Sequence, residues 1–114
     1  MTALRQVPLP IHSALEMLIG LALIGAPFAL GLSTPALIVG VVVGAIIAGV
    51  ALRAVEPGRT TSVSAHHAAD HGVALGMAGA ALVLASVDGT AAVLFAAAAA
   101  AQLALNLTTR YSTR

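Results

Sequence analysis

The sequence predicts an all-α membrane protein with four transmembrane helices, arranged as two tandem helical hairpins related by a pseudo-two-fold axis. Three observations support this fold class. Only 8% of the 114 residues are charged, the five arginines lie at the ends of apolar segments or beyond them, and four such segments occupy residues 11–31, 35–55, 70–87 and 89–107. A bilayer core about 30 Å thick is crossed by about 20 apolar residues of α-helix, so each segment is long enough to span it.

The overall composition excludes several classes of protein. Hydrophobic residues make up 60% of the chain, and a chain of this length could not bury that much apolar surface as a water-soluble monomer. The net charge of +1 argues against a nucleic-acid partner. Cysteine is absent, which excludes disulfides and thiol chemistry.

The first apolar segment, residues 11–31, is expected to be a retained helix and not a cleaved signal. Only Arg5 precedes it, Glu16 lies within its first turns, and the segment is longer than the usual signal core of about 7–15 residues. Pro27 removes a backbone hydrogen bond near the end of the segment, which predicts a kink near Leu23.

Short turns at residues 32–34 and 87–89 make the helices on either side of each turn antiparallel neighbours. Between the two hairpins, Pro57 and Gly58 end the second segment and begin a polar loop. The predicted organisation is a single membrane domain, residues 1–114, made of hairpin repeat 1 (11–55), a polar cytoplasmic loop (56–69) and hairpin repeat 2 (70–107).

The distribution of arginine predicts the orientation in the membrane. The five arginines are found before the first segment, around the central loop and after the last segment: Arg5, Arg53, Arg59, Arg110 and Arg114. Positively charged loops remain in the cytoplasm, so both termini and the central loop should be cytoplasmic and the two short turns external. The use of arginine without lysine, with abundant alanine, indicates a bacterial genome, and we expect a multi-pass protein of the bacterial inner (plasma) membrane, in contact with the lipid bilayer.

The two hairpins look like copies of one unit. Shifting the chain by 54 positions places His12 on His66 and Glu16 on Asp70, so that two His-x-x-x-acid patterns fall at equivalent places. This predicts a parallel repeat whose pseudo-two-fold axis runs along the membrane normal.

The stretch from Leu18 to Gly31 resembles the first helix of the SPW-repeat family of small bacterial integral membrane proteins. In that family a Ser-Pro-Trp motif lies late in the first helix of a hairpin repeat. Here the motif reads Ala26-Pro27-Phe28, and the equivalent place in the second hairpin reads Ala80-Ala81-Leu82. The resemblance implies a fold and no activity.

Stripes of small residues indicate where helices approach closely, because membrane helices associate through small residues and interhelical hydrogen bonds. One stripe comprises Gly40, Gly44 and Ala48, and another comprises Gly72, Gly76 and Ala80. Each is either an internal seam or a contact with another molecule, namely a homo-oligomer or a membrane-protein partner.

Gln102 and Asn106 share a face of the last helix by their i, i+4 spacing. We expect them to hydrogen-bond a neighbouring helix near the cytoplasmic boundary. A contact with a substrate is the alternative.

The residues best suited to bind a ligand are histidines and acids. His12 and Glu16 share one helix face, and His66 and Asp70 share another. Brought together by the pseudo-two-fold, two imidazoles and two carboxylates would suit Zn²⁺ or a similar divalent metal. His67 and His71 are alternate ligands. The competing interpretation is structural: the histidines lie where the loop meets the third helix, and Asp70 suits the first turn of a helix.

No other cofactor is predicted. Haem ligation by His12 and a histidine of the second hairpin is disfavoured because no aromatic lining is evident. Glu16 lies inside the first span, where an acid is costly unless it is paired or hydrated. It is either paired with a nearby histidine or serves as a proton- or cation-linked carboxylate.

The preferred functional prediction is a structural or accessory subunit of a larger membrane assembly. The alternatives are a small proton- or cation-coupled transporter and a metal-binding membrane protein that uses the His/acid cluster. The chain is similar in length, helix number and acid position to the small multidrug resistance family, but lacks its aromatic substrate cage and its weak arginine bias. No nucleophile–base pair or phosphate-binding loop can be placed, so the sequence does not predict an enzyme.

Overall fold

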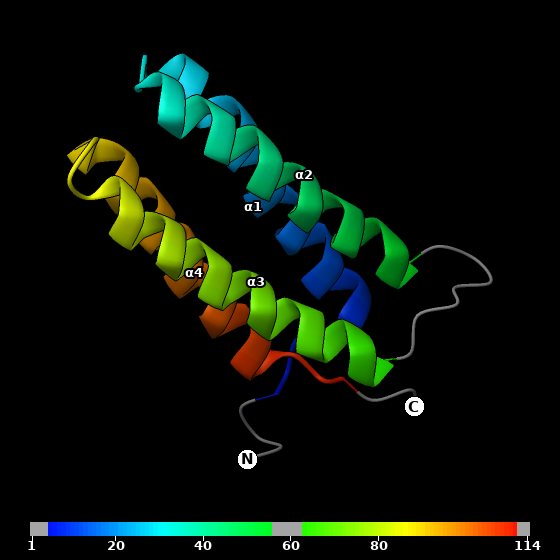
Figure 1. Cartoon of the computed structure of the whole chain (residues 1–114). Helices are drawn as coiled ribbons and strands as arrows, with labels where there is room; N and C mark the ends of the chain where they lie inside the picture. The colour runs from blue at the N-terminus through cyan, green and yellow to red at the C-terminus, as the bar shows by residue number, and fades with distance from the viewer. Residues whose placement is uncertain (1–4, 56–62, 112–114) are drawn as a thin grey trace.

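In the computed structural model, which describes residues 5–55 and 63–111, the chain forms four helices. They are α1 (Leu9–Ala29), α2 (Thr34–Val55), α3 (Val63–Leu84) and α4 (Gly89–Thr108). The helices form two hairpins that lie side by side, with α1 against α2 and α3 against α4 (Figure 1). The hairpins meet where α2 contacts α3 and where α1 contacts α4. The prediction of an all-helical fold of four helices is confirmed.

Three of the helices are long and apolar enough to cross a membrane: α1, α2 and α4. Among the described residues α3 does not meet this criterion, although it is 22 residues long. Its first turns contain the polar residues His66, His67, Asp70 and His71, which lower its hydropathy.

The predicted start of α3 was wrong. The helix begins at Val63 and not at Asp70, so residues 63–69, expected in the loop, are helical. The segment contains no proline or glycine before Gly72, and its polar residues at positions 66 and 70 face the protein interior, where partners from α1 make the helix favourable. The histidines therefore lie in the first turns of α3 and not in the loop. The remainder of the expected loop, residues 56–62, lies outside the described part of the chain.

The turn between α1 and α2 is closed by a Schellman motif. Gly31 has a φ of +64°, the left-handed conformation that glycine adopts at little cost. The Leu32 N–H donates to the Pro27 carbonyl, and the Gly31 N–H donates to the Phe28 carbonyl. These bonds satisfy the last carbonyl groups of α1 at the start of the predicted tight turn.

A single carboxylate connects the two short turns, residues 30–33 and 85–88. Asp88 is the N-cap of α4, where Oδ1 accepts the Ala91 N–H at 3.1 Å. Its Oδ2 accepts the Ser33 N–H of the other hairpin at 2.9 Å. The bond from Ser33, with the capping bonds, holds the pKa of Asp88 below its ordinary value.

The seam between α1 and α2 is built on glycine. A Cβ added at Gly44 would lie 2.5 Å from the Gly20 carbonyl oxygen and 2.6 Å from Ile24 Cγ1. One at Gly20 would lie 2.8 Å from the Gly44 carbonyl oxygen. The stripe that includes Gly40 and Gly44 is therefore an internal seam, as one of the two expectations had it.

The stripe of Gly72, Gly76 and Ala80 does not form a close seam of this kind. No atom lies within 4 Å of a Cβ added at Gly72 or Gly76, so these glycines form no tight seam. They instead line an open apolar groove of about 320 Å³ between α2 and α3, opposite residues that include Val43 and Ile47.

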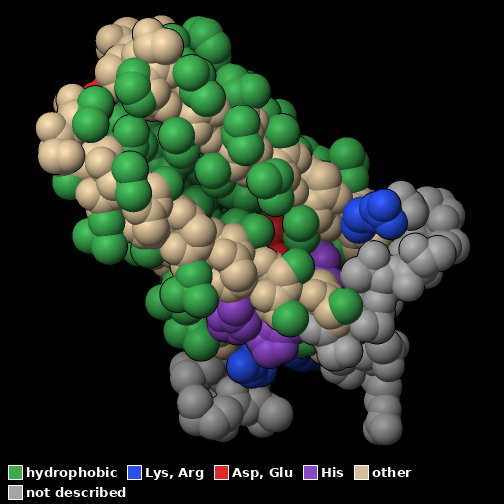
Figure 2. All heavy atoms as spheres, in the orientation of Figure 1, with side chains coloured by type: hydrophobic (Ala, Val, Ile, Leu, Met, Phe, Trp, Pro, Cys, Tyr) green, Lys and Arg blue, Asp and Glu red, His purple; other side chains and the backbone are tan. Residues whose placement is uncertain are grey.

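The interior has an apolar half and a polar half. Large buried apolar side chains occupy the half toward the two short turns: Leu23, Met77 and Phe95, with Ile47 beside them. The other half contains buried polar side chains from α1, α3 and α4. Apolar side chains cover much of the face seen in Figure 2, whereas arginine and histidine gather at one end of it.

Candidate metal centre

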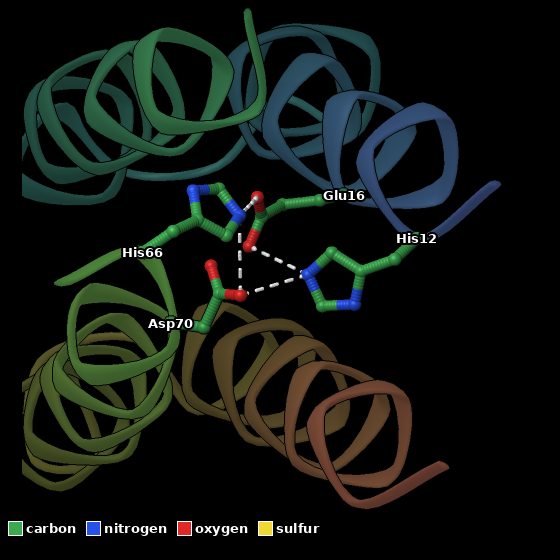
Figure 3. Close-up of side chains that lie close together, drawn as sticks. All are labelled: His12, Glu16, His66 and Asp70. Carbon is green, nitrogen blue, oxygen red and sulfur yellow. Dashed lines mark ion pairs between the residues drawn. The ribbon is translucent and has the colours of Figure 1, made fainter. Parts of the chain in front are cut away.

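Four side chains converge in the polar half of the bundle. His12 and Glu16 lie one turn apart on α1, and His66 and Asp70 lie one turn apart on α3. They point toward one another across the interface between the hairpins (Figure 3). All four are buried, with at most 3% of any residue exposed. The sequence-predicted residues are thus brought together as the pseudo-two-fold argument expected.

The donor atoms of this cluster lie close to one another. His12 Nε2 is 2.9 Å from Asp70 Oδ2 and 3.6 Å from Glu16 Oε2. His66 Nε2 is 3.3 Å from Asp70 Oδ2 and 3.7 Å from Glu16 Oε1. One ligand atom from each residue can be chosen so that all four lie within 4.8 Å of one another.

The nitrogen–oxygen separations are close to those of tetrahedral coordination. A zinc ion with ligands at about 2.0–2.1 Å holds neighbouring donor atoms about 3.3–3.4 Å apart. The four nitrogen–oxygen separations, from 2.9 to 3.7 Å, lie on either side of that value. These separations use both carboxylate oxygens of Glu16. With one ligand atom from each residue the four atoms lie within 4.8 Å of one another, so the side chains would have to move by roughly 1 Å to complete such a site.

The two buried acids of the cluster need compensation. Glu16 and Asp70 are both fully buried, and two carboxylates in an apolar medium are costly unless cations or hydrogen-bond donors compensate them. Glu16 Oε1 and Asp70 Oδ1 have no hydrogen-bond partner among the described residues. The compensation can come from protons on the imidazoles or on a carboxyl group, or from one divalent cation.

Thr109 determines which nitrogen of His12 faces the carboxylates. The Thr109 hydroxyl donates to the Leu105 carbonyl at 2.6 Å, which uses its only proton. Its oxygen lies 2.7 Å from His12 Nδ1 and must therefore accept a proton from that nitrogen. We infer from this network that Nδ1 carries hydrogen, so that neutral His12 presents the lone pair of Nε2 to Asp70. Two acceptors at 2.9 Å require a proton or a metal ion between them.

Helix α4 provides the amide groups of the cluster. Gln102 Nε2 donates to Glu16 Oε2 and to Asn106 Oδ1, at 2.8 Å in each case. Both residues are fully buried. The prediction that Gln102 and Asn106 hydrogen-bond a neighbouring helix is confirmed for Gln102, whose partner is Glu16 of α1. The bond fixes one oxygen of Glu16 and leaves the other directed toward His66.

Tyr111 belongs to the cluster, which the sequence did not predict. Its hydroxyl donates to Asp70 Oδ2 at 2.7 Å. Burial, followed by this bond, raises the pKa of the Tyr111 phenol, so the hydroxyl remains a donor.

The two ends of the described chain are joined beside the cluster. Val7 and Thr109 form an isolated parallel bridge, in which Val7 N–H donates to the Thr108 carbonyl and Arg110 N–H to the Val7 carbonyl. Arg5 Nη1 donates to the Thr109 carbonyl at 3.0 Å. These contacts hold Thr109 and Tyr111 in place. They also bring the positive charge of Arg5 close to the cluster.

His67 and His71, the alternate ligands, do not belong to the buried cluster. They face each other at the half-buried edge of α3, with their Nε2 atoms 2.9 Å apart. The structure thus separates the four histidines into two pairs.

Sequence spacing could identify His12, Glu16, His66 and Asp70, because i, i+4 pairs share a face. It could not identify Thr109 and Tyr111, which follow the last span and carry no motif. No protein-family model, curated protein or solved structure matches this chain. The similarity of residues 18–31 to the SPW-repeat family therefore remains a prediction.

Proposed function

We propose that this chain is a multi-pass protein of the bacterial inner membrane whose core binds a divalent transition metal, with Zn²⁺ the best fit. The observation that supports the binding function is the set of four separations, 2.9–3.7 Å, among two imidazoles and two carboxylates. Histidine and carboxylate ligands in this number are typical of zinc.

Charge balance favours a divalent ion over other ligands. Two neutral imidazoles and two carboxylates carry a charge of −2, which one divalent cation neutralises without leaving a buried net charge. The hydrogen bond from His12 Nδ1 to Thr109 also follows the pattern of metal-binding histidines, whose second nitrogen donates to an acceptor.

All four helices span the membrane in this proposal, including α3. Two of the four polar residues that lower the hydropathy of α3, His66 and Asp70, face the interior, and the other two, His67 and His71, are half-buried. Its outward-facing side chains are apolar: Leu75 is 75% exposed, Leu82 79% and Val83 72%. A helix with this surface is stable against lipid while its polar face is satisfied inside the bundle.

The cluster lies at the cytoplasmic end of the bundle, where arginine gathers (Figure 2). Arg53 lies in the last turn of α2, and Arg5 contacts the backbone beside the cluster. The positive-inside rule then places the described ends of the chain in the cytoplasm. The contacts between the hairpins support the pseudo-two-fold axis. A rotation that places α1 on α3 and α2 on α4 would map the α1–α4 contact onto the α3–α2 contact, and both contacts are present.

The arrangement favours metal retention over transport. Phe95, Met77 and Leu23 are buried in the half of the core that separates the cluster from the two short turns. An ion in the cluster would therefore exchange with the cytoplasmic side. Such a protein would act as a membrane-embedded metal-binding subunit. This function is consistent with the predicted accessory role and adds a metal ion as the ligand.

Zinc binding by the purified protein tests the proposal. Full-length protein in mild detergent is treated with a chelator and titrated with Zn²⁺ against a competing indicator. We expect stoichiometric binding that weakens at least 100-fold in Asp70→Asn and Glu16→Gln, because each loses a charged ligand.

Asp88→Asn is the matched control, since it removes an acid at the opposite end of the bundle. Its zinc affinity should equal that of wild type. Unchanged affinity in Asp70→Asn and Glu16→Gln, with folding intact, would mean that the cluster is structural only.

A further inference from the structure

The second histidine pair has the geometry of a ligand pair. His67 and His71 lie one turn apart on α3, and their Nε2 atoms are 2.9 Å apart. Their rings are tilted by 52°, with centroids 4.7 Å apart. A bond between two Nε2 atoms requires one to carry a proton and the other to present its lone pair. The separation is about 0.4 Å shorter than the two nitrogen ligands of a tetrahedral zinc ion require.

This pair is more accessible than the buried cluster. His67 and His71 are each half-buried, whereas His12 is fully buried and His66 nearly so. A groove of about 290 Å³ beside His71 is lined by alanine and leucine from α3 and α4, so it offers an ion no further ligand. An ion held by the two imidazoles would complete its coordination with water.

Tyr111 lies between the two histidine pairs. Its ring stacks on His67, with centroids 4.1 Å apart and an angle of 20°. The same ring meets His12 edge-on, with centroids 5.4 Å apart. Its hydroxyl donates to Asp70 Oδ2. One side chain therefore contacts the accessible pair on one side and two members of the buried cluster on the other.

We propose that His67 and His71 form an outer binding position for the same class of divalent cation, from which the buried cluster is filled when Tyr111 moves aside. The inference rests on the proposed metal-binding function for its second half, the transfer. Binding of an ion by the outer pair would stand without it. Moving Tyr111 requires breaking its hydrogen bonds to Asp70 and Asn106 and its ring contacts with His67 and His12. The backbone bonds at Val7 can remain.

Zinc stoichiometry tests the outer position. Chelator-treated full-length protein in detergent is equilibrated with radioactive Zn²⁺ across a range of concentrations. Wild type should bind two ions per chain, one more weakly than the other. The His67→Ala/His71→Ala double variant should lose the weaker ion and retain the tighter one. His67→Gln/His71→Gln, which preserves polar side chains in case alanine disturbs folding, should behave in the same way.

The opposite variant separates this inference from the proposed function. Glu16→Gln/Asp70→Asn should lose the tighter ion and retain the weaker one. If it loses neither, the buried site is refuted while the outer position stands. If the double histidine variants still bind two ions, or if wild type binds one ion that they retain, the outer position is refuted.

The rate of filling tests the transfer. Rapid mixing with Zn²⁺ should fill the buried site several-fold more slowly in the double histidine variants than in wild type. Tyr111→Ala should fill it faster, because the ring that separates the two positions is gone. Unchanged filling rates in both would refute transfer through the outer position, even where the outer ion binds.

Discussion

Thr109→Val tests most closely how the fold orients His12 for the proposed metal centre. Valine has nearly the shape of threonine, so the packing beside His12 is retained. The substitution removes the oxygen that accepts the His12 Nδ1 hydrogen at 2.7 Å and the hydroxyl that donates to Leu105 at 2.6 Å. His12 can then carry its hydrogen on Nε2, where it blocks the lone pair that faces Asp70.

The expected loss of zinc affinity follows from the contact of Thr109 with His12, a proposed ligand. Loss of the hydrogen-bond partner of a metal-binding histidine costs about 10- to 100-fold in metal affinity, which equals about 1.4–2.8 kcal/mol. The buried hydrogen bonds also contribute to folding, and their loss should lower the free energy of unfolding by about 1–3 kcal/mol. Zinc titration against a competing indicator and thermal unfolding of the metal-free protein measure the two effects.

Thr108→Val provides the matched control. The Thr108 hydroxyl likewise donates to the carbonyls of Ala104 and Leu105, at 2.9 and 3.3 Å, but no contact of this hydroxyl with His12 is present among the described residues. Its zinc affinity should remain within about twofold of wild type. Equal affinities in the two valine variants would refute the assignment of the His12 tautomer and the role given to Thr109.

Three further predictions concern the fold and its orientation. Gly44→Ala should destabilise the protein by about 1–3 kcal/mol, because its Cβ would force α1 and α2 apart by about 1 Å. Gly49→Ala on the same helix meets no atom within 4 Å, so its stability should stay within about 0.5 kcal/mol of wild type. Equal losses of stability in thermal unfolding of the two variants would contradict the seam between α1 and α2. The pKa of Asp88 is lowered by folding, so its contribution is present above its ordinary value of 3.8 and disappears as the pH falls through the lowered value. The difference in Tm between wild type and Asp88→Ala should accordingly shrink toward zero under strong acid, and a constant difference would contradict the linkage. Reporter fusions at residues 1, 58 and 114 should report the cytoplasm and a fusion at position 88 the outside, whereas mixed signals at one site would indicate dual topology.

The sequence predicted the residues of the site whose positions follow from the helical i, i+4 spacing. The spacing of His12 and Glu16 places both on one face of a helix, and the 54-residue offset repeats that face at His66 and Asp70. Two hairpins whose first helices begin at the same end then bring the pairs together. Gln102 was predicted for the same reason, because its i, i+4 relation to Asn106 marks a polar stripe in an apolar helix.

The rest depended on tertiary contacts that no spacing encodes. Thr109 and Tyr111 reach the cluster because the chain after α4 pairs with Val7, a contact between segments about 100 residues apart. The early start of α3 was missed for a related reason. Hydropathy treats His66 as a loop residue, whereas in the structure it is buried against the acids of the cluster.

The coordination of bound zinc is the most direct test of the central claim. X-ray absorption at the zinc edge is measured on the His67→Ala/His71→Ala variant loaded with one Zn²⁺, so that the buried site alone contributes. We predict four nitrogen or oxygen ligands at about 2.0–2.1 Å, with outer-shell scattering from two imidazole rings that falls to one ring when His12 is also replaced by alanine. Six oxygen ligands without imidazole scattering, or a spectrum unaffected by the loss of His12, would contradict the proposed metal centre.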